Sequence, residues 1–255
     1  MSQIQATATI ITHNEALHIA ACIRSVDWFA EVLVIDSGSS DETVALARAA
    51  GARVIENPWP GFGLQKQFAV DHASHSWVFS LDADERVSEA LKHSMRALLA
   101  TEPAKSAYQV NRCNHFMGRP LRHGEGYPDW CLRLFNRNQA RWSDDVVHEK
   151  VLCDGQASKL QGDLDHYSQE SLAAYIGKQN RYTTLQAEGL FARGKDASLI
   201  KLTLSPLVRF IKFYLFRRGF LDGVPGLVHI ALGCFNSFVK YAKLRELCLR
   251  NGKSH

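Results

Sequence analysis

The sequence predicts an α/β fold with a mostly parallel, Rossmann-like sheet flanked by helices and followed by a helical C-terminal extension. Through the first hundred residues, short β-branched or apolar runs alternate with segments of helical spacing. This alternation is typical of a parallel sheet whose strands are joined by helices. From Glu170 onward the pattern is almost wholly helical, so we expect a sheet domain over residues 1–165 and a helical region over 166–255.

Strands are expected where β-branched or apolar residues run together, and helices where apolar residues recur at every third or fourth position. Asp41 suits the N-cap of one helix, because its carboxylate can accept a backbone N–H. In chain order the expected elements are strands at 6–12, 31–35, 53–56 and 77–81, helices at 15–25, 41–50 and 63–73, and strand-rich segments at 107–111, 119–138 and 159–168.

Composition narrows the class of protein. Hydrophobic residues make up 46% and charged residues 22% of the 255 positions, which suits a globular protein with a sizeable core. A formal net charge of +4 is too small to indicate a nucleic-acid partner, and none is expected. Six cysteines without a CxxC pair favour a reduced, cytoplasmic protein. We expect no secretory signal, and no apolar window is long enough to predict a spanning helix.

Three polar clusters directly follow three of the predicted strands. They are THNE at 12–15, DSGSSD at 36–41 and DADE at 82–85. The carboxyl ends of parallel strands meet at one edge of a sheet, and ligands of such folds bind there. The sequence therefore predicts one binding site built from all three clusters.

The third cluster is the most acidic. Asp82 and Asp84 are two positions apart, and Glu85 follows at once. A Mg²⁺ or Mn²⁺ ion in an enzyme typically takes one or two carboxylates together with phosphates of a substrate. Either aspartate could instead cap the helix expected to start near Ser88. The buried strand before the cluster, and Asp36 at a neighbouring strand end, favour a metal that carries a diphosphate.

The three clusters lie in segments that resemble a known family. TATIITHNE, VLVIDSGSSDET and WVFSLDADE resemble, in this order, the nucleotide-sugar-binding signatures of family 2 glycosyltransferases with the GT-A fold. Further along, GYPDWCLRLFNR, VVHEKV and GFLDGVPG resemble the subgroup that adds glucose or a similar hexose to the inner core of bacterial lipopolysaccharide. The resemblance runs from about Thr7 to Leu244, which is nearly the whole chain.

The resemblance implies a UDP-sugar donor and a divalent metal, Mg²⁺ or Mn²⁺. Asp84 would be the principal metal ligand, and Asp82 would face the ribose or the metal. Many relatives carry DDGS where this chain has DSGS at 36–39, and the subgroup commonly reads DSGS. The residues expected to contact the nucleotide are Thr12, Asn14, Glu15, Asp36, Ser37, Lys66, Asp82 and Arg133. For Lys66, a solvated helix face is the competing interpretation.

An inverting transferase needs a carboxylate that takes the proton from the acceptor hydroxyl. The segment RWSDDVVHEKV offers Asp144, Asp145 and Glu149. We expect the base to be Glu149, with Asp145 as the alternative. His148 could ligate the metal or position a phosphate, and it could equally be a structural histidine.

The segment GYPDWCLRLFNR is expected to line the acceptor side, through Tyr127, Asp129 and Trp130. Trp130 offers an apolar platform for the face of a sugar, although it could also be a core residue of a strand. Arg133 and Arg137 could meet a phosphate of the donor or the acceptor, because a guanidinium suits phosphate geometry.

The C-terminal third mixes basic and apolar residues. PLVRFIKFYLFRRGF, at 206–220, has the composition of a basic amphipathic helix that lies in a membrane interface. We expect residues 199–250 to bind an anionic membrane surface without crossing the bilayer. A helix packed on the catalytic domain, with its lysines and arginines solvated, is the alternative.

The expected function is an inverting, metal-dependent hexosyltransferase, peripheral on the cytoplasmic face of the inner membrane. The resemblance implies UDP-glucose as donor and a lipid-linked saccharide as acceptor, namely an inner-core heptose of lipopolysaccharide. A polyprenyl-linked or peptide acceptor, a sugar nucleotidyltransferase, and a non-catalytic membrane-bound nucleotide-binding module are the alternatives.

Overall fold

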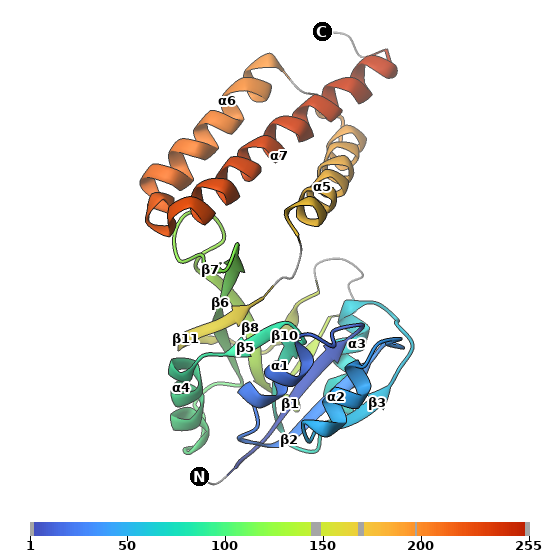
Figure 1. Ribbon diagram of the computed structural model, residues 1–255, viewed down its shortest axis with the longest axis vertical. Helices are drawn as coiled ribbons and strands as arrows, with labels where there is room; N and C mark the ends of the chain where they lie inside the picture. Colours follow the sequence, from blue (N-terminus) through green and yellow to red (C-terminus); the bar gives the residue numbers. More distant parts are fainter. Residues whose placement is uncertain (1–2, 144–148, 168–170, 197, 253–255) are drawn as a thin grey trace. The chain divides into compact units, whose positions relative to one another are not determined.

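The computed structural model describes residues 3–143, 149–167, 171–196 and 198–252. The chain divides into two compact units, which Figure 1 shows with their labelled elements. The sheet unit comprises Met1–Cys113 and Pro128–Tyr167, and the helical unit comprises Asn114–Tyr127 and Ser168–His255. Residues 114–127 lie inside the predicted catalytic domain in sequence, yet they group with the C-terminal helices. The functional division at residue 165 stays a prediction.

The chain has one mixed sheet of nine strands, in the order β3-β2-β1-β4-β8-β6-β11-β5, with β7 paired to β6. The sheet unit holds this sheet except for β7 and the last three residues of β6, which belong to the helical unit. β1, β2, β3 and β4 pair in parallel, whereas β8 is antiparallel to β4 and β6. The strands are β1 (Ile4–Thr12), β2 (Phe29–Asp36), β3 (Arg53–Glu56), β4 (Trp77–Asp82), β5 (Glu85–Val87), β6 (Ala107–Phe116), β7 (Arg119–Pro120), β8 (Asp129–Asn136) and β11 (Ser158–His166), while β9 (Ala140–Trp142) and β10 (Val151–Cys153) form a separate hairpin.

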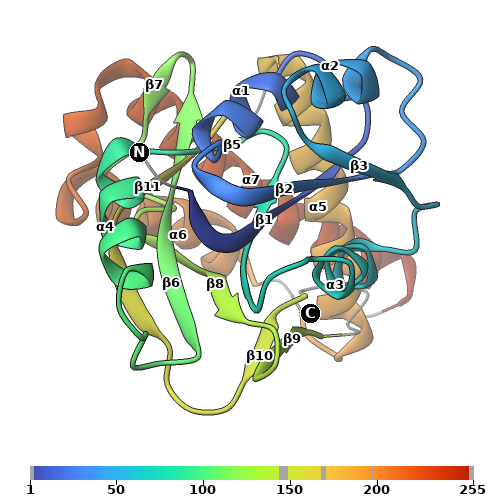
Figure 2. The same cartoon turned by 90° about the horizontal axis from the view of Figure 1, so that it is seen from below.

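Helices cover both faces of the parallel strands. They are α1 (Ile19–Ser25), α2 (Thr43–Ala49), α3 (Phe62–Asp71) and α4 (Glu89–Leu99). Successive residues of a strand point to opposite faces, so Ile10 packs with the core of α1, α2 and α4, whereas Ile11 packs with Ala69 of α3. Figure 2 shows α3 on the side of the sheet away from α1 and α2. The predicted α/β architecture with flanking helices is confirmed.

Strand register brings the polar clusters together. Thr12 at the end of β1 is opposite Asp36 at the end of β2, and Ile11 is opposite Asp82 at the end of β4. The three strands therefore end within one residue of one another at the same edge of the sheet, as the sequence predicts.

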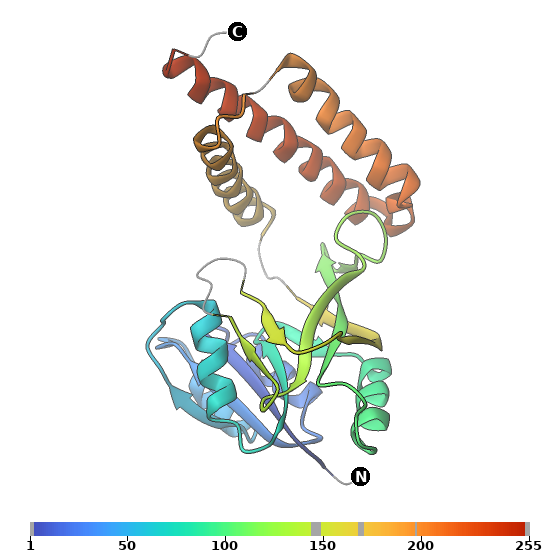
Figure 3. The ribbon, with the colours of Figure 1, turned by 180° about the vertical axis from the view of Figure 1, so that it is seen from behind.

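The helical unit contains α5 (Leu172–Ala192), α6 (Leu199–Phe210), the π-helical turn η1 (Ile211–Phe216), the 3₁₀ turn η2 (Gly219–Asp222) and α7 (Gly223–Arg250). Both α5 and α6 pack against α7, as the reverse view in Figure 3 shows. Ala187, Leu244 and Cys248 form a small buried core. Within the described residues, no helix is sufficiently long and apolar to traverse a bilayer.

The helix expected at 206–220 has different bounds. α6 begins at Leu199 behind the N-cap Ser198, whose hydroxyl accepts the N–H of Lys201. Pro206 lies inside α6, where it lacks the N–H that a helix interior uses. The helix passes into the wider η1 turn at Ile211 and ends before Arg218, whose φ of 54° is left-handed. The segment 206–220 is therefore not one helix: α6 continues into η1, and η2 begins separately at Gly219.

Candidate active site

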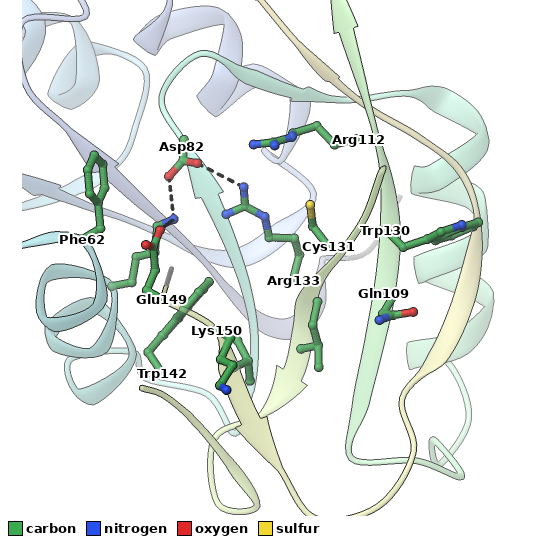
Figure 4. A pocket seen from close by; sticks show the side chains of 13 residues that line it. Phe62, Asp82, Gln109, Arg112, Trp130, Cys131, Arg133, Trp142, Glu149 and Lys150 are labelled. Carbon is green, nitrogen blue, oxygen red and sulfur yellow. Dashed lines mark hydrogen bonds and ion pairs between the residues drawn. The ribbon is translucent and has the colours of Figure 1, made fainter. Parts of the chain in front are cut away.

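A cavity of about 600 Å³ opens at the carboxyl end of β4. Four charged side chains from separate elements meet in it, namely Lys66 of α3, Asp82 of β4, Arg133 of β8 and Glu149, which precedes β10. Figure 4 labels Asp82, Arg133 and Glu149 among the lining side chains. Its remaining lining residues are Phe62, Gln109, Arg112, Trp130, Cys131, Leu132, Trp142, Lys150 and Val151. The sheet unit thus gathers predicted donor, base and acceptor residues around one pocket.

Lys66 connects two of the carboxylates. Its Nζ lies 3.3 Å from Oδ1 of Asp82 and 3.3 Å from Oε1 of Glu149, and 4.9 Å from the centre of the Trp142 ring. The side chain is only 5% exposed, so Lys66 does not lie on a solvated helix face. Lysine amines are rarely buried unless they are paired, and here the two acids provide the pairing.

The buried Arg133 pairs with the other carboxylate oxygen of Asp82, Oδ2. One terminal nitrogen is 3.1 Å from Oδ2 of Asp82 and 2.7 Å from Oε1 of the fully buried Glu85. Burial alone would raise the pKa of Asp82, but the charges of Lys66 and Arg133 hold it well below its usual value. Burial raises the pKa of Glu85, although Arg133 opposes this shift. Asp82 is therefore ionised, with a cation at each oxygen.

The other terminal nitrogen of Arg133, NH1, is buried and has no hydrogen-bond partner among the described residues. A buried donor without a partner is costly. A guanidinium fork also matches the oxygens of a phosphate group. This unpaired N–H group beside the cavity is what an anionic ligand would satisfy, and it fits the predicted nucleotide diphosphate.

Asp84 faces a different partner, His166 at the end of β11. Nε2 of His166 is 3.0 Å from Oδ2 of Asp84. Burial alone would lower the pKa of His166, but the hydrogen bond and charge of Asp84 raise it above its usual value. Glu15 is in the same electrostatic neighbourhood, since burial first and then the charges of Asp84 and Asp41 raise its pKa to about 7.

Sequence reasoning missed His166. The segment 159–168 is recognised as a strand, but a single histidine at a strand end carries no signal of its own. The missing information is the pairing of β11 with β5, which puts His166 opposite Glu85 and therefore next to Asp84. That pairing joins strands about eighty residues apart and has no local pattern.

The first two strand ends form an ordered pair of loops. Both carboxylate oxygens of the buried Asp36 are used by its own loop, where Gly38 and Ser39 donate their N–H groups to Oδ2 and the Ser39 hydroxyl donates to Oδ1. Asn14, at a left-handed φ of 55°, accepts the N–H of Ser40 through its side chain at 2.8 Å. A direct contact of Asp36 with the nucleotide stays a prediction.

Ser37 and Thr12, two further predicted nucleotide contacts, differ in whether their hydroxyl groups are already hydrogen-bonded. Ser37 accepts a hydrogen bond from Gln65 of α3 at 3.0 Å. The hydroxyl of Thr12 is buried and has no hydrogen-bond partner among the residues that the structure describes. Thr12 therefore has bonding capacity left at the strand edge.

The predicted acceptor residues fall in both units. Trp130 lines the cavity, and the ammonium of Lys159 lies 4.4 Å from the centre of its ring. Asp129 is ion-paired with Arg112 at 2.8 Å. Tyr127 belongs to the helical unit, where its carbonyl accepts a hydrogen bond from Arg217. Asp144, Asp145 and His148 lie outside the described residues.

Arg137 has a place outside the cavity. Its guanidinium donates to the carbonyls of Val70 and Ala73 at the end of α3. This contact satisfies carbonyl groups at a helix C-terminus, where a cation is favourable. The structure therefore gives Arg137 a structural role and no contact with the pocket.

Comparisons with known proteins find a matching family model and relatives similar over most of the chain. The family described as "Glycosyl transferase family 2" matches residues 7–155. The chain is 34% identical over 254 residues to the lipopolysaccharide core biosynthesis glycosyltransferase LpsC of Rhizobium meliloti, covering 94% of this chain and 92% of LpsC. It is 33% identical over 254 residues to an uncharacterised glycosyltransferase of Rickettsia typhi, covering 95% of this chain and 87% of that protein.

A solved structure resembles the whole chain in fold. It is the mannosyltransferase PcManGT of Pyrobaculum calidifontis in complex with GDP-Man and Mn²⁺. The TM-score is 0.52 at 14% sequence identity, and the match covers 100% of this chain and 89% of that one. At this identity the likeness shows the fold alone.

Proposed function

Because the chain belongs to glycosyltransferase family 2, we propose that it moves a hexose from a nucleoside diphosphate sugar to a lipid-linked saccharide, with inversion at the anomeric carbon. Glycosyltransferase activity follows from the family. The donor, the acceptor and the stereochemistry are the proposal. The observation that carries it is the cavity in which Lys66 joins Asp82 to Glu149, beside the buried guanidinium of Arg133.

Glu149 is the proposed base. The acceptor hydroxyl attacks the anomeric carbon, its proton passes to the carboxylate of Glu149, and the bond from that carbon to the diphosphate oxygen breaks. The pair with Lys66, at 3.3 Å, holds the Glu149 carboxylate in the cavity. Asp145 is the alternative base.

The cations of the cavity are proposed to receive the diphosphate. NH1 of Arg133 is buried and unpaired within the described chain, so a phosphate oxygen there would gain a charge-assisted hydrogen bond. Lys66 also lines the cavity, and we propose it as the second cation for the diphosphate. Both charges stabilise the negative charge that develops as the diphosphate departs. Asp82, which lies between them, keeps the two cations in place.

We propose that a divalent ion binds next to the cavity, at Asp84 and His166. Asp84 and His166 offer an oxygen and a nitrogen ligand at neighbouring strand ends, and carboxylate oxygen is the ligand that Mg²⁺ and Mn²⁺ prefer. These two residues would hold the metal, with Asp82 closer to the ribose side. When bound, the ion would neutralise charge on the leaving diphosphate.

The nucleoside is proposed to bind along the ends of β1 and β2. The unpaired Thr12 hydroxyl is available to the ribose or the base. Glu15, which follows the end of β1, is proposed to contact the ribose or the base. Asp36 and Ser37 order their loop, and Asn14 connects the two loops.

UDP-glucose is the proposed donor, and an inner-core heptose of lipopolysaccharide is the proposed acceptor. The likeness to LpsC, which is named for lipopolysaccharide core biosynthesis, supports the acceptor. Trp130, half-buried at the cavity wall, offers its ring to a sugar face, and Tyr127 and Asp129 precede it in the sequence. A polyprenyl-linked or peptide acceptor is the alternative.

Replacing Glu149 tests the chemistry. Glu149→Gln should lower transfer from UDP-glucose by roughly 10²–10⁴-fold, because the amide cannot take the proton. Thermal stabilisation by UDP with Mn²⁺ should be retained, since the donor site is intact. Asp145→Asn is the matched control for the alternative base. Full activity of Glu149→Gln together with loss in Asp145→Asn would move the base to Asp145.

The metal has its own test. Chelation by EDTA, or Asp84→Ala, should abolish transfer, and added Mn²⁺ should restore only the wild type. The stabilisation of the folded protein by UDP should also depend on the ion, which gives a readout separate from activity. Undiminished UDP stabilisation and transfer in the presence of EDTA would remove the metal from the proposal.

We further propose that residues 199–250 bind the cytoplasmic face of the inner membrane. An apolar stripe at helical spacing is exposed on α6 and η1, formed by Ile200, Leu204, Val208, Ile211 and Leu215. Lys201, Lys212, Arg217 and Arg218 are exposed on the same segment. The lone acidic residue between 199 and 245 is Asp222, and it is buried. An apolar surface flanked by cations alone is complementary to an anionic bilayer.

A further inference from the structure

Asp222, at the start of α7, is a buried carboxylate that is satisfied by a distant segment of the chain. Its Oδ1 accepts the N–H of Arg122 at 3.2 Å and contacts Nδ1 of His123 at 2.8 Å. Its Oδ2 accepts the N–H of His123 at 2.8 Å. Asp222 is only 5% exposed. A buried charge is costly unless hydrogen bonds compensate it, and here the segment 121–127 supplies those bonds.

The same segment has further contacts with the helical unit. The N–H of Gly124 donates to the carbonyl of Arg217 at 2.8 Å, and the guanidinium of Arg217 donates to the carbonyl of Tyr127 at 2.8 Å. Glu125 is ion-paired with Arg209 through both of its carboxylate oxygens. Four consecutive residues from Arg122 to Glu125, together with Tyr127, are therefore bonded to residues between 209 and 222.

Packing at two glycines shows that this fit is close. A Cβ on Gly124 would lie 3.0 Å from Cδ1 of Ile230 and 3.2 Å from Cα of Gly219, and its φ of +71° is left-handed. A Cβ on Gly219 would lie 3.3 Å from Cα of Gly124 and 2.8 Å from the carbonyl oxygen of Phe213. Contacts this short leave no room for a side chain, so the segment 121–127 has one well-defined conformation on η2 and α7.

Chain continuity connects this segment to the cavity wall. Tyr127 is followed by Pro128, Asp129 and Trp130, and Trp130 lines the cavity. Asp129 is fixed in the sheet unit by Arg112 and by its N–H bond to Asn111. The segment thus lies between β6 and β8, and both strands contribute lining residues. None of its residues belongs to the ends of β1, β2 or β4, where the donor groups are.

We propose that Asp222 is a positioning residue for the acceptor, because it fixes the conformation of residues 121–127 and thereby the chain that leads into Trp130. The proposal rests on the proposed function for the identity of the acceptor as a saccharide. Asp222 itself touches neither donor nor acceptor. Its carboxylate holds the two N–H groups of Arg122 and His123, and their release changes acceptor binding while donor binding is kept.

The experiment compares Asp222→Ala and Asp222→Asn with Ser237→Ala in the full chain. Ser237 is buried and hydrogen-bonded to Ser205 at 2.8 Å, so its variant loosens the same helical unit without touching the segment. UDP-glucose is the donor, and heptose-terminated lipopolysaccharide in detergent micelles is the acceptor. The KM for the acceptor should rise at least tenfold in Asp222→Ala and less in Asp222→Asn, which keeps one oxygen acceptor. The KM for UDP-glucose should change less than twofold in all three variants.

Hydrogen exchange supplies a readout that needs no acceptor. Amides of residues 122–124 should exchange at least tenfold faster in Asp222→Ala and at the wild-type rate in Ser237→Ala. The proposal would be overturned if Asp222→Ala raised the KM for the acceptor and the KM for UDP-glucose equally. It would also be overturned if Ser237→Ala raised the acceptor KM as much as Asp222→Ala does. If wild-type protein transfers nothing to the micellar acceptor, the proposed function fails. In that case the role of Asp222 is decided by two measurements on Asp222→Ala, hydrogen exchange at residues 122–124 and the rate of UDP-glucose hydrolysis. Unchanged hydrogen exchange overturns the proposal. Faster exchange together with an unchanged hydrolysis rate supports it.

Discussion

Single residues of this chain show how one carboxylate can fix several strands. Glu31 of β2 accepts hydrogen bonds from Thr7 of β1 at 2.6 Å, from Arg53 of β3 at 2.8 Å and from the N–H of Ser74, ahead of β4, at 2.7 Å. Burial alone would raise the pKa of Glu31, but these hydrogen bonds lower it to about 2. The carboxylate is therefore much more stable ionised in the folded chain than in the unfolded one.

The depressed pKa of Glu31 predicts a pH dependence of stability. Its contribution is complete above the unfolded value of about 4.5 and is lost as the pH falls towards the folded value of about 2. Glu31→Gln should lower the free energy of unfolding at pH 7 by roughly 2 kcal/mol, and the difference from wild type should shrink between pH 5 and pH 2. Urea unfolding over this pH range measures it.

Glu56→Gln is the matched control for Glu31. The ion pair of Glu56 with Arg48 is 3.8 Å long and mostly exposed on both sides, and exposed pairs contribute about 0–1 kcal/mol. A pH-independent difference for Glu31→Gln, or an equal loss in Glu56→Gln, would contradict the assignment of this pH dependence to the hydrogen bonds of Glu31.

The candidate site was only partly visible in single residues of the sequence. Asp82, Asp84 and Glu149 could be selected because carboxylates that directly follow an apolar strand, or gather in an acidic segment, are rarely needed for packing. The burial of Lys66 could not be predicted, since a lysine on a short helix is usually solvated, and its two partners come from β4 and the segment before β10. His166 depends on a strand pairing that the sequence does not display.

Among the elements, the parallel strands were predicted best. β3 has the expected bounds, and β1, β2 and β4 extend beyond the expected bounds by at most two residues at either end. The helix expected from Glu15 begins only at Ile19, because Asn14 is left-handed and Glu15 forms a turn through its carbonyl to the N–H groups of His18 and Ile19. β5, β9 and β10 were missed, since three residues are too few for a periodicity.

The contact of α4 with β11 gives a prediction about one element pair. Gly162 of β11 has a φ of +96°, and a Cβ there would lie 2.2 Å from the backbone nitrogen of Leu91 in α4. Gly162→Ala should therefore push α4 away from the sheet and lower the free energy of unfolding by at least about 3 kcal/mol. Denaturant unfolding with tryptophan fluorescence measures the loss.

Gly155→Ala is the control that separates backbone strain from steric clash. Gly155 also has a positive φ, +88°, but no atom lies within 4 Å of a Cβ built on it. Its substitution should show only the strain of a left-handed residue, about 1–2 kcal/mol. An equal loss of unfolding free energy in Gly162→Ala and Gly155→Ala would mean that α4 moves away from the new Cβ at no measurable cost.

At the scale of the whole molecule, the proposed membrane surface predicts binding to vesicles. Wild-type protein should sediment with vesicles that contain phosphatidylglycerol, and much less with neutral phosphatidylcholine, because each basic residue near an anionic surface contributes about 1 kcal/mol. Leu204→Glu, which puts an acid into the apolar stripe, should reduce binding at least fivefold. Leu185→Glu on α5 is the control, since Leu185 is at least as exposed as Leu204 but lies outside the stripe. Equal binding of the two variants would place the contact elsewhere.

The order of the two units along the chain has a consequence for dissection of the protein. Residues 114–127 leave the sheet unit and return to it, so the backbone passes between the units after Cys113, after Tyr127 and after Tyr167. A fragment that stops at Tyr167 would keep the excursion but lose Asp222, Arg209 and Arg217, which hold it. Removing the last third of the chain should therefore leave residues 114–127 without these hydrogen-bond partners. When the helical unit is exchanged between relatives, residues 114–127 should be exchanged with it.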